Sequence, residues 1–283
     1  MKKWCFSEGQ PMKELKKEWI QTMKLIENIK LKYKKHLFVF EELTKRDFKQ
    51  KYKRTVLGMG WSVLSPLLML LIMRVVFTQF FGRHAEHYTT YLFAGNIVMA
   101  FFREATQGGM MALMGNKHIF SRINVPKYLF LLSKNVSSII NFGLTLVVFF
   151  FFAALDGITF TWEFLLLIYP IFCLIVLNLG VGLILSALCV FFQDIRHLYD
   201  IFLMFLQYVS AIFYYVDAYP VATQRVFLAN PVYCIITYIR QIVIENRIPS
   251  LEMHVLILVY ALLVLGIGAL IYKKKNHKFL YYV

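Results

Sequence analysis

Long apolar runs separated by short polar segments dominate the chain. A helix needs about 20 mostly apolar residues to cross a bilayer. The pattern predicts an all-α polytopic membrane protein with six transmembrane helices, at residues 61–81, 88–114, 136–155, 162–192, 198–216 and 251–272. The fourth run, 162–192, is longer than a bilayer requires, so we expect it to tilt, to kink at Pro170 or to project into water.

A shorter apolar stretch, NPVYCIITYIRQIVI, lies between the fifth and sixth predicted spans. It contains too few apolar residues to cross a bilayer. Asn230 suits the cap of a helix, and Pro231 suits its first turn. We expect an interfacial or re-entrant helix on the outer side of the membrane, or alternatively a surface amphipathic helix with no part in a pathway.

Basic residues are concentrated in three segments. Residues 1–54 hold 16 of the 31 Lys and Arg against 7 acidic residues, residues 115–135 have four basic residues and no acidic one, and four lysines follow residue 272. The positive-inside rule assigns such segments to the cytoplasm, so we expect both termini there. The net charge of +15 would suggest nucleic acid in a soluble protein. No nucleic-acid-binding motif accompanies it, and we expect membrane lipid as the partner of the basic N-terminal segment.

A loosely amphipathic helix is predicted at residues 37–56, after a basic cytoplasmic extension at 1–36. Its cations would lie among lipid headgroups. Gly58 and Gly60 would then allow a sharp turn into the first span, with Trp61 at headgroup level. The helix either has a functional role or is a passive anchor that only sets topology. Its apolar arc comprises Phe40, Leu43, Phe48, Tyr52 and Val56, and Arg46, Lys49, Gln50 and Lys53 lie mostly opposite.

Two charged residues, Arg103 and Glu104, lie in the middle of the second predicted span. An unpaired charge there costs about 2.5 kcal/mol or more on insertion scales, so both side chains should face protein or water. They indicate either a pathway or gate position, or a structural pairing with neighbouring helices.

Aromatic residues follow one another along the fifth predicted span. Sugar rings present flat C–H faces that pack on aromatic rings, so an aromatic wall would let a glycan slide without strong fixed hydrogen bonds. The same spacing also serves ordinary helix packing. The residues are Tyr199, Phe202, Phe205, Tyr208, Phe213 and Tyr214.

Motifs for catalysis and for phosphate or metal binding are absent from the sequence. There is no GxxxxGK[ST] loop, no HExxH, no GxSxG and no paired metal-ligand spacing. We therefore expect no catalytic residue, no metal and no cofactor in this chain, and if it is a pump, its energy must come from another subunit.

Four stretches show a recognisable order of motifs. RDFKQKYKRTVLGMGWSVLSPLL has a basic aromatic helix, then Leu-Gly, a Trp and a Pro. FFREATQGGMMALMGNKHIFSRINVPKYLFLLS has an aromatic pair with a nearby Glu, then Asn, an apolar pair and two basic residues around a Pro. FFQDIRHL and ANPVYCIITYIRQIVIENRIPS follow. Together they resemble the membrane subunits (permeases) of type-2 ABC exporters of lipid-linked polysaccharides, which carry O-antigen, teichoic acid or capsule-type polymers. Gln193 stands where relatives often have Arg, and Ser210-Ala211 where they have Ser-Pro.

The resemblance implies a six-helix ABC-2 type domain at 57–275 with a cytoplasmic tail at 276–283, in the bacterial cytoplasmic membrane. Two copies would surround a channel above two nucleotide-binding ATPase subunits, which bind ATP and Mg. A gate helix would meet the polyprenyl diphosphate of the glycan, and a coupling helix would dock on the ATPase. The implied gate residues are Lys49, Lys51, Tyr52, Lys53, Arg54 and Trp61; the coupling residues are Asn116, Lys117, Ile119, Phe120, Arg122, Pro126 and Lys127; the outer re-entrant residues are Asn230, Pro231, Tyr238 and Arg240; and the channel candidates are Phe101, Glu104, Phe205, Tyr208 and Tyr214.

Two other functions stay open at this point. An ABC-2 permease for a drug or small lipid would share the motifs, and only the basic access helix and short outer loops argue for a polymer. A membrane glycosyltransferase would need paired carboxylates on a water-facing loop, where the sequence offers only Asp156 and Glu163.

Overall fold

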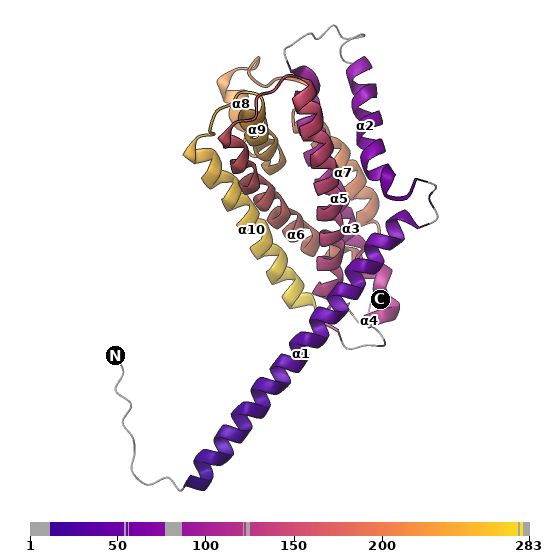
Figure 1. Cartoon of the computed structure of the whole chain (residues 1–283), viewed down its shortest axis with the longest axis vertical. Coiled ribbons are helices and arrows are strands. Elements are labelled where there is room, and N and C mark those ends of the chain that lie inside the picture. The colour runs from indigo at the N-terminus through magenta and orange to yellow at the C-terminus, as the bar shows by residue number, and fades with distance from the viewer. Residues whose placement is uncertain are drawn as a thin grey trace, which may run out of the picture.

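The computed structural model describes residues 12–53, 55, 57–76, 87–120, 122, 125–276 and 278–279. Within these ranges every regular element is a helix, which confirms the all-α prediction. The helices form an elongated bundle, with α8 and α9 at one end and a long helical arm leaving the other (Figure 1).

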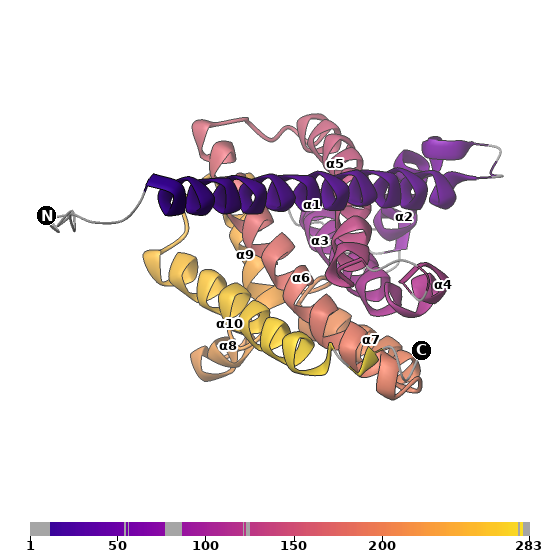
Figure 2. The same ribbon diagram turned by 90° about the horizontal axis from the view of Figure 1, so that it is seen from below.

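The arm is the first half of α1, a single helix at Met12–Tyr52. Its second half crosses the bundle, and the first half projects beyond it (Figures 1 and 2). We expected the helix to begin at residue 37, and this boundary was wrong. Residues 12–52 contain neither Gly nor Pro, so nothing in the sequence interrupts the helix.

A tight turn joins α1 to the first predicted span. Gly58 has φ +51°, a left-handed conformation that favours glycine, and opens the short 3-10 helix η1 (Gly58–Gly60). Then α2 (Trp61–Arg74) follows. The turn at Gly58 confirms the expected role of this residue, and the predicted end of the span at residue 81 lies outside the described residues.

The next helices, α3 and α5, are joined by short helices at the end of the bundle from which the arm projects. The second predicted span is α3 (Tyr88–Met111), which a short 3-10 helix, η3 (Met114–Asn116), joins to α4 (Lys117–Phe120). After it, α5 (Tyr128–Leu155) begins at residue 128 rather than 136. The polar side chains of 133–135 had hidden its first turns in the hydropathy pattern.

The fourth predicted span is divided. It begins as a 3-10 helix, η4 (Trp162–Leu167), and continues as α6 (Ile168–Phe191). Pro170 therefore lies in the first turn of α6, where its missing N–H costs little, and not at a kink within the helix.

The helices of the last two predicted spans differ in length. The sixth predicted span is α10 (Leu251–Lys275). The fifth contains α7 (Ile195–Val209), which ends before the predicted boundary at residue 216. Then α8 (Val221–Phe227) and α9 (Pro231–Val243) meet at 107°.

Three segments of the described chain are long and apolar enough to cross a membrane: Tyr128–Leu155, Trp162–Phe191 and Leu251–Lys275. The bent α8–α9 pair would make a fourth if it formed one broken span. The six-span count stays a prediction.

Glycines allow the core helices to approach closely. A Cβ added to Gly180 on α6 would lie 2.6 Å from the Leu265 backbone nitrogen on α10, and one on Gly109 would lie 3.0 Å from the Gly182 Cα. Small residues of this kind let helix backbones touch where lipid supplies no hydrophobic drive for association. The α3–α6–α10 core is thus fixed, α5 packs against α3 and α6, and α1 and α2 pack against α5.

Candidate functional site

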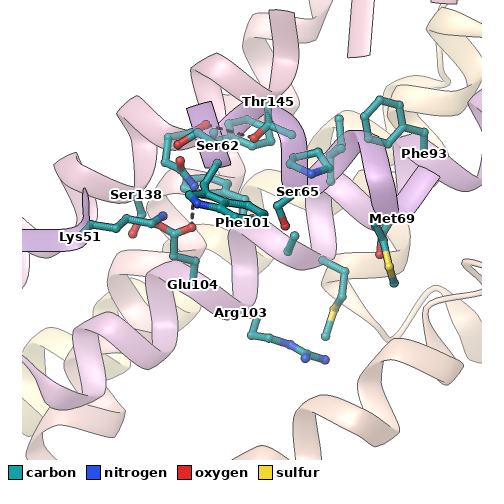
Figure 3. Close-up of a pocket in the computed structure, with 18 of the residues that line it drawn as sticks. Lys51, Ser62, Ser65, Met69, Phe93, Phe101, Arg103, Glu104, Ser138 and Thr145 are labelled. Atoms are coloured by element: carbon teal, nitrogen blue, oxygen red, sulfur yellow. Dashed lines mark hydrogen bonds and ion pairs between the residues drawn. The ribbon is translucent and has the colours of Figure 1, made fainter. Parts of the chain in front are cut away.

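A cavity of about 580 Å³ opens beside the α1–α2 junction. We call it the junction cavity. Its walls come from α1, α2, α3, α5 and α7, so it joins segments that are far apart in sequence (Figure 3). The cavity brings together Lys51, Tyr52 and Trp61 of the expected gate segment with the channel candidates Phe101 and Glu104.

One carboxylate links three helices at this cavity. Lys51 Nζ of α1 donates to Glu104 Oε1 of α3 at 2.8 Å, and Asn141 Nδ2 of α5 donates to Glu104 Oε2 at 2.8 Å. The Tyr52 hydroxyl donates to Asn141 Oδ1 at 2.8 Å and also contacts Ser62 Oγ. The end of α1 is therefore latched onto the bundle by this network, which Figure 3 shows in part.

Arg103 and Glu104 do not form a pair with each other. Arg103 Nη2 donates to Gln207 Oε1 of α7 at 2.8 Å, and Figure 3 shows Arg103 turned away from Lys51 and Glu104. Each charge is held by neighbouring helices, as one of the two sequence interpretations required. Both residues also line the junction cavity, as the other required.

The remaining gate candidates lie at the end of α1 and just after it. Lys49 and Lys53 are exposed, Trp61 is 43% exposed on the cavity rim, and Arg54 lies outside the described residues. Sequence reasoning missed Asn141 and Ser62. The only signal was that each is a polar residue within an apolar run.

A second polar cluster, also missed, attaches α1 to α5. Asp47 is buried and accepts from Arg46 Nη2 at 2.7 Å, Lys134 Nζ at 3.1 Å and Ser133 Oγ at 3.0 Å. Arg46 Nη2 also donates to Asn116 Oδ1 at 2.7 Å. The cluster therefore connects α1 to the segment expected to contact an ATPase.

The expected coupling residues divide by exposure. Lys117 and Arg122 are exposed, whereas the Asn116 side chain is buried and donates to Ala112 O at 2.7 Å. The Asn116 amide is committed inside the chain, so the exposed residues of this segment are the ones available to a partner, and the coupling role stays a prediction. Ile119 packs on the cluster around Leu43. Only the helical backbone of Phe120 is described.

The end of the coupling segment contacts the last helix. Lys127 Nζ donates to the Asn276 carbonyl at 2.8 Å, and partial burial lowers the pKa of Lys127. Pro126 and Lys127 are half-buried. These contacts hold Lys127 against the end of α10.

The aromatic channel candidates have different environments. Phe101 is buried and stacks on Phe142 with ring centroids 4.3 Å apart, while Phe205 and Tyr208 are exposed by 60% and 62% on α7. Tyr214 is half-buried, and its hydroxyl donates to Tyr208 O at 2.8 Å. An aromatic wall for a glycan could form only on the outer face of α7, outside the core of one chain.

The expected re-entrant residues form a tightly bonded unit. The Asn230 side chain accepts from Val232 N and so caps α9, where Pro231 is the first residue, as predicted. The Tyr238 hydroxyl lies 2.6 Å from His254 Nε2. Arg240, 5% exposed, donates to three backbone carbonyls and lies 3.4 Å from the Tyr91 ring centroid. This end of the bundle is therefore held by polar contacts as well as by packing.

Comparison with known protein families now identifies the class. Residues 39–244, well over half of the chain, match the family of ABC-2 type transporters. The chain therefore belongs to this family of membrane transport proteins. The matched region begins within α1 and ends directly after α9, so it includes the junction cavity and the Arg240 unit.

The relatives are more specific. The chain is 23% identical over 241 residues to the O-antigen export system permease protein RfbA of Myxococcus xanthus, covering 84% of this chain and 92% of that protein. Two proteins of the same name from Klebsiella pneumoniae are 25% and 24% identical over 258 and 256 residues, each covering 89% of this chain and 98% of the relative.

Proposed function

We propose that this chain is the membrane permease of an ATP-driven exporter of a polyprenyl-diphosphate-linked polysaccharide, similar to O-antigen. The observation that carries the proposal is near full-length similarity to three O-antigen export permeases. Two copies form the channel, with their exposed α7 aromatic faces toward it, in the bacterial cytoplasmic membrane. ATP and Mg bind to two separate ATPase subunits, and both termini lie on the side of those subunits.

The junction cavity supports this function because it places cations where a lipid-linked substrate arrives. Lys51 and Arg103 line it together with several hydroxyl and amide side chains. A diphosphate binds ammonium and guanidinium groups through charge-assisted hydrogen bonds. Glu104 holds Lys51 before the substrate arrives, and a phosphate oxygen takes its place. Release of Lys51 from Glu104 frees the end of α1 to move.

We expect that replacing Lys49, Lys51 and Lys53 by Gln reduces capture of the lipid-linked glycan by about tenfold or more, because charge-assisted hydrogen bonds contribute about 1.5–3 kcal/mol each. Export from inverted vesicles that contain the chain and its ATPase measures this. The matched control replaces Lys30, Lys34 and Lys35, which are exposed near the middle of α1 and do not line the junction cavity. Equal export by the two triple variants would contradict the gate role. Stimulation of ATP hydrolysis by a small lipid but not by the polymer would contradict the polysaccharide assignment.

Removing the Glu104 charge that holds Lys51 should improve substrate capture, the opposite of removing the lysines. We expect Glu104→Gln to lower the glycan concentration needed for half-maximal export by about two- to fivefold, since a partly exposed ion pair is worth up to about 1 kcal/mol. The Lys51 and Glu104 side chains are 37% and 33% exposed. Glu252→Gln, at the exposed start of α10, should change nothing. An unchanged or higher half-maximal concentration for Glu104→Gln would exclude competition for Lys51.

A further inference from the structure

A second cavity, of about 350 Å³, lies where α5 begins and α10 ends. It shares no lining residue with the junction cavity. We call it the lysine cavity, after Lys127 and Lys273 in its wall. Asn276, Tyr272, Ala269 and Leu183 also line it, and none of its lining residues is acidic.

The rim of the lysine cavity carries positive charge that is partly fixed in place. Lys127 Nζ is held by the Asn276 carbonyl at 2.8 Å and lies 5.4 Å from the centroid of the Phe279 ring. Lys273 is exposed and comes from the last turn of α10, which also carries Lys274 and Lys275. Two ammonium groups on one rim without a carboxylate favour an anion.

The floor of the cavity has a different character. It is an open apolar wall made by the half-buried Leu183 of α6 and the exposed Ala269 of α10, and Ala269 lies about one helical turn before Lys273. Tyr272, in the same wall, is 7% exposed, and its hydroxyl has no hydrogen-bond partner among the described residues. A buried hydroxyl without a partner is costly, which favours a polar ligand atom nearby. Charged rim and apolar floor are thus about one helical turn apart.

We propose that the lysine cavity binds an anionic phospholipid, with its phosphodiester between Lys127 and Lys273 and its first methylene groups against Leu183 and Ala269. Inorganic phosphate offers the same charge but leaves the apolar floor empty. The ligand lies on the surface of α10 and belongs to the surrounding bilayer. The site does not depend on what the transporter exports.

The test measures phosphatidylglycerol retained by the purified full chain after exchange from phosphatidylglycerol vesicles into detergent, by native mass spectrometry. We expect Lys127→Gln with Lys273→Gln to weaken retention by roughly 25-fold, because each lysine near a membrane surface contributes about fivefold. Lys274→Gln with Lys278→Gln removes the same charge from exposed positions outside the cavity and should retain the lipid.

A second variant guards against a local loss of structure. Ala269→Trp keeps both lysines and fills the apolar floor, and we expect it to lose the lipid as well. Equal losses in the two double variants would show attraction to surface charge alone and overturn the site. Retention by Ala269→Trp, or displacement of the lipid by millimolar inorganic phosphate, would overturn the lipid assignment.

Discussion

Replacing Arg240 by Met is expected to lower the free energy of unfolding by about 3–5 kcal/mol, the range found when a buried charge network is broken. Arg240 Nε and Nη2 donate to Tyr91 O at 3.2 and 3.1 Å, Nη1 donates to Ala211 O at 2.9 Å, and Nη2 also reaches Ile212 O at 3.1 Å. Met fills the volume but removes the guanidinium donors to these carbonyls. Unfolding in a denaturing detergent, followed by circular dichroism, measures the change.

Arg247→Met is the matched control because Arg240 lies in the last turn of α9 and Arg247 follows shortly after that helix ends. Its side chain is 62% exposed and pairs with Glu245, so its loss should stay within about 0.5 kcal/mol. Arg240→Lys should be destabilising too, since an ammonium cannot reproduce the planar fork of the guanidinium. If Arg240→Met and Arg247→Met lowered the free energy of unfolding by the same amount, the buried guanidinium would not be what connects α9 to α3 and to the segment after α7.

The Arg240 unit also explains a glycine that the hydropathy pattern does not single out. A Cβ on Gly95 would lie 2.8 Å from Arg240 Nη2 and 3.2 Å from Ile212 Cγ2. Glycine at this position makes room for the guanidinium beside α3. Ala211, two residues after the end of α7, has φ +49°, a left-handed conformation, and its carbonyl accepts from Arg240. The buried Arg240 side chain thus depends on two backbone features, the glycine at 95 and the left-handed conformation of Ala211.

The hydropathy pattern predicted where helices lie because each span must hide its backbone from lipid along its whole length. It failed where polar side chains find partners inside the protein. Ser133 and Lys134 disguised the start of α5, yet both contact Asp47 of α1. It failed again at Ser210, whose hydroxyl accepts from the Asn230 side chain directly after α7 ends.

The sequence predicted which residues belong to the candidate site, but not which of them contact one another. The motifs identified Lys51 and Glu104 separately, as gate and channel residues. Their ion pair joins positions 53 apart in sequence, and no local pattern predicts such a contact. Asn116 is the reverse case. The resemblance assigns it to the coupling segment, and only the structure reveals that its side chain, which is 3% exposed, bonds Arg46.

Loss of the Asp47 charge should release α1 from the bundle. The Asp47 side chain is 1% exposed and balances both Arg46 and Lys134, so Asp47→Asn leaves two cations without their carboxylate. We expect about 2 kcal/mol of local destabilisation or more, equivalent to a factor of about 30 in the opening equilibrium. Hydrogen exchange of the amides at residues 43–52 measures it.

Glu42→Gln controls for charge on the same helix. Glu42 pairs with Lys45 at 3.1 Å, but the two side chains are 55% and 60% exposed, so exchange at 43–52 should hardly change. Amides of α10, which packs on α6, should keep their protection in both variants. Because Arg46 also bonds Asn116, Asp47→Asn should loosen the α4 segment together with α1. Faster exchange in α1 with unchanged exchange at 114–120 would contradict that mechanical link and leave the gate and the coupling segment independent.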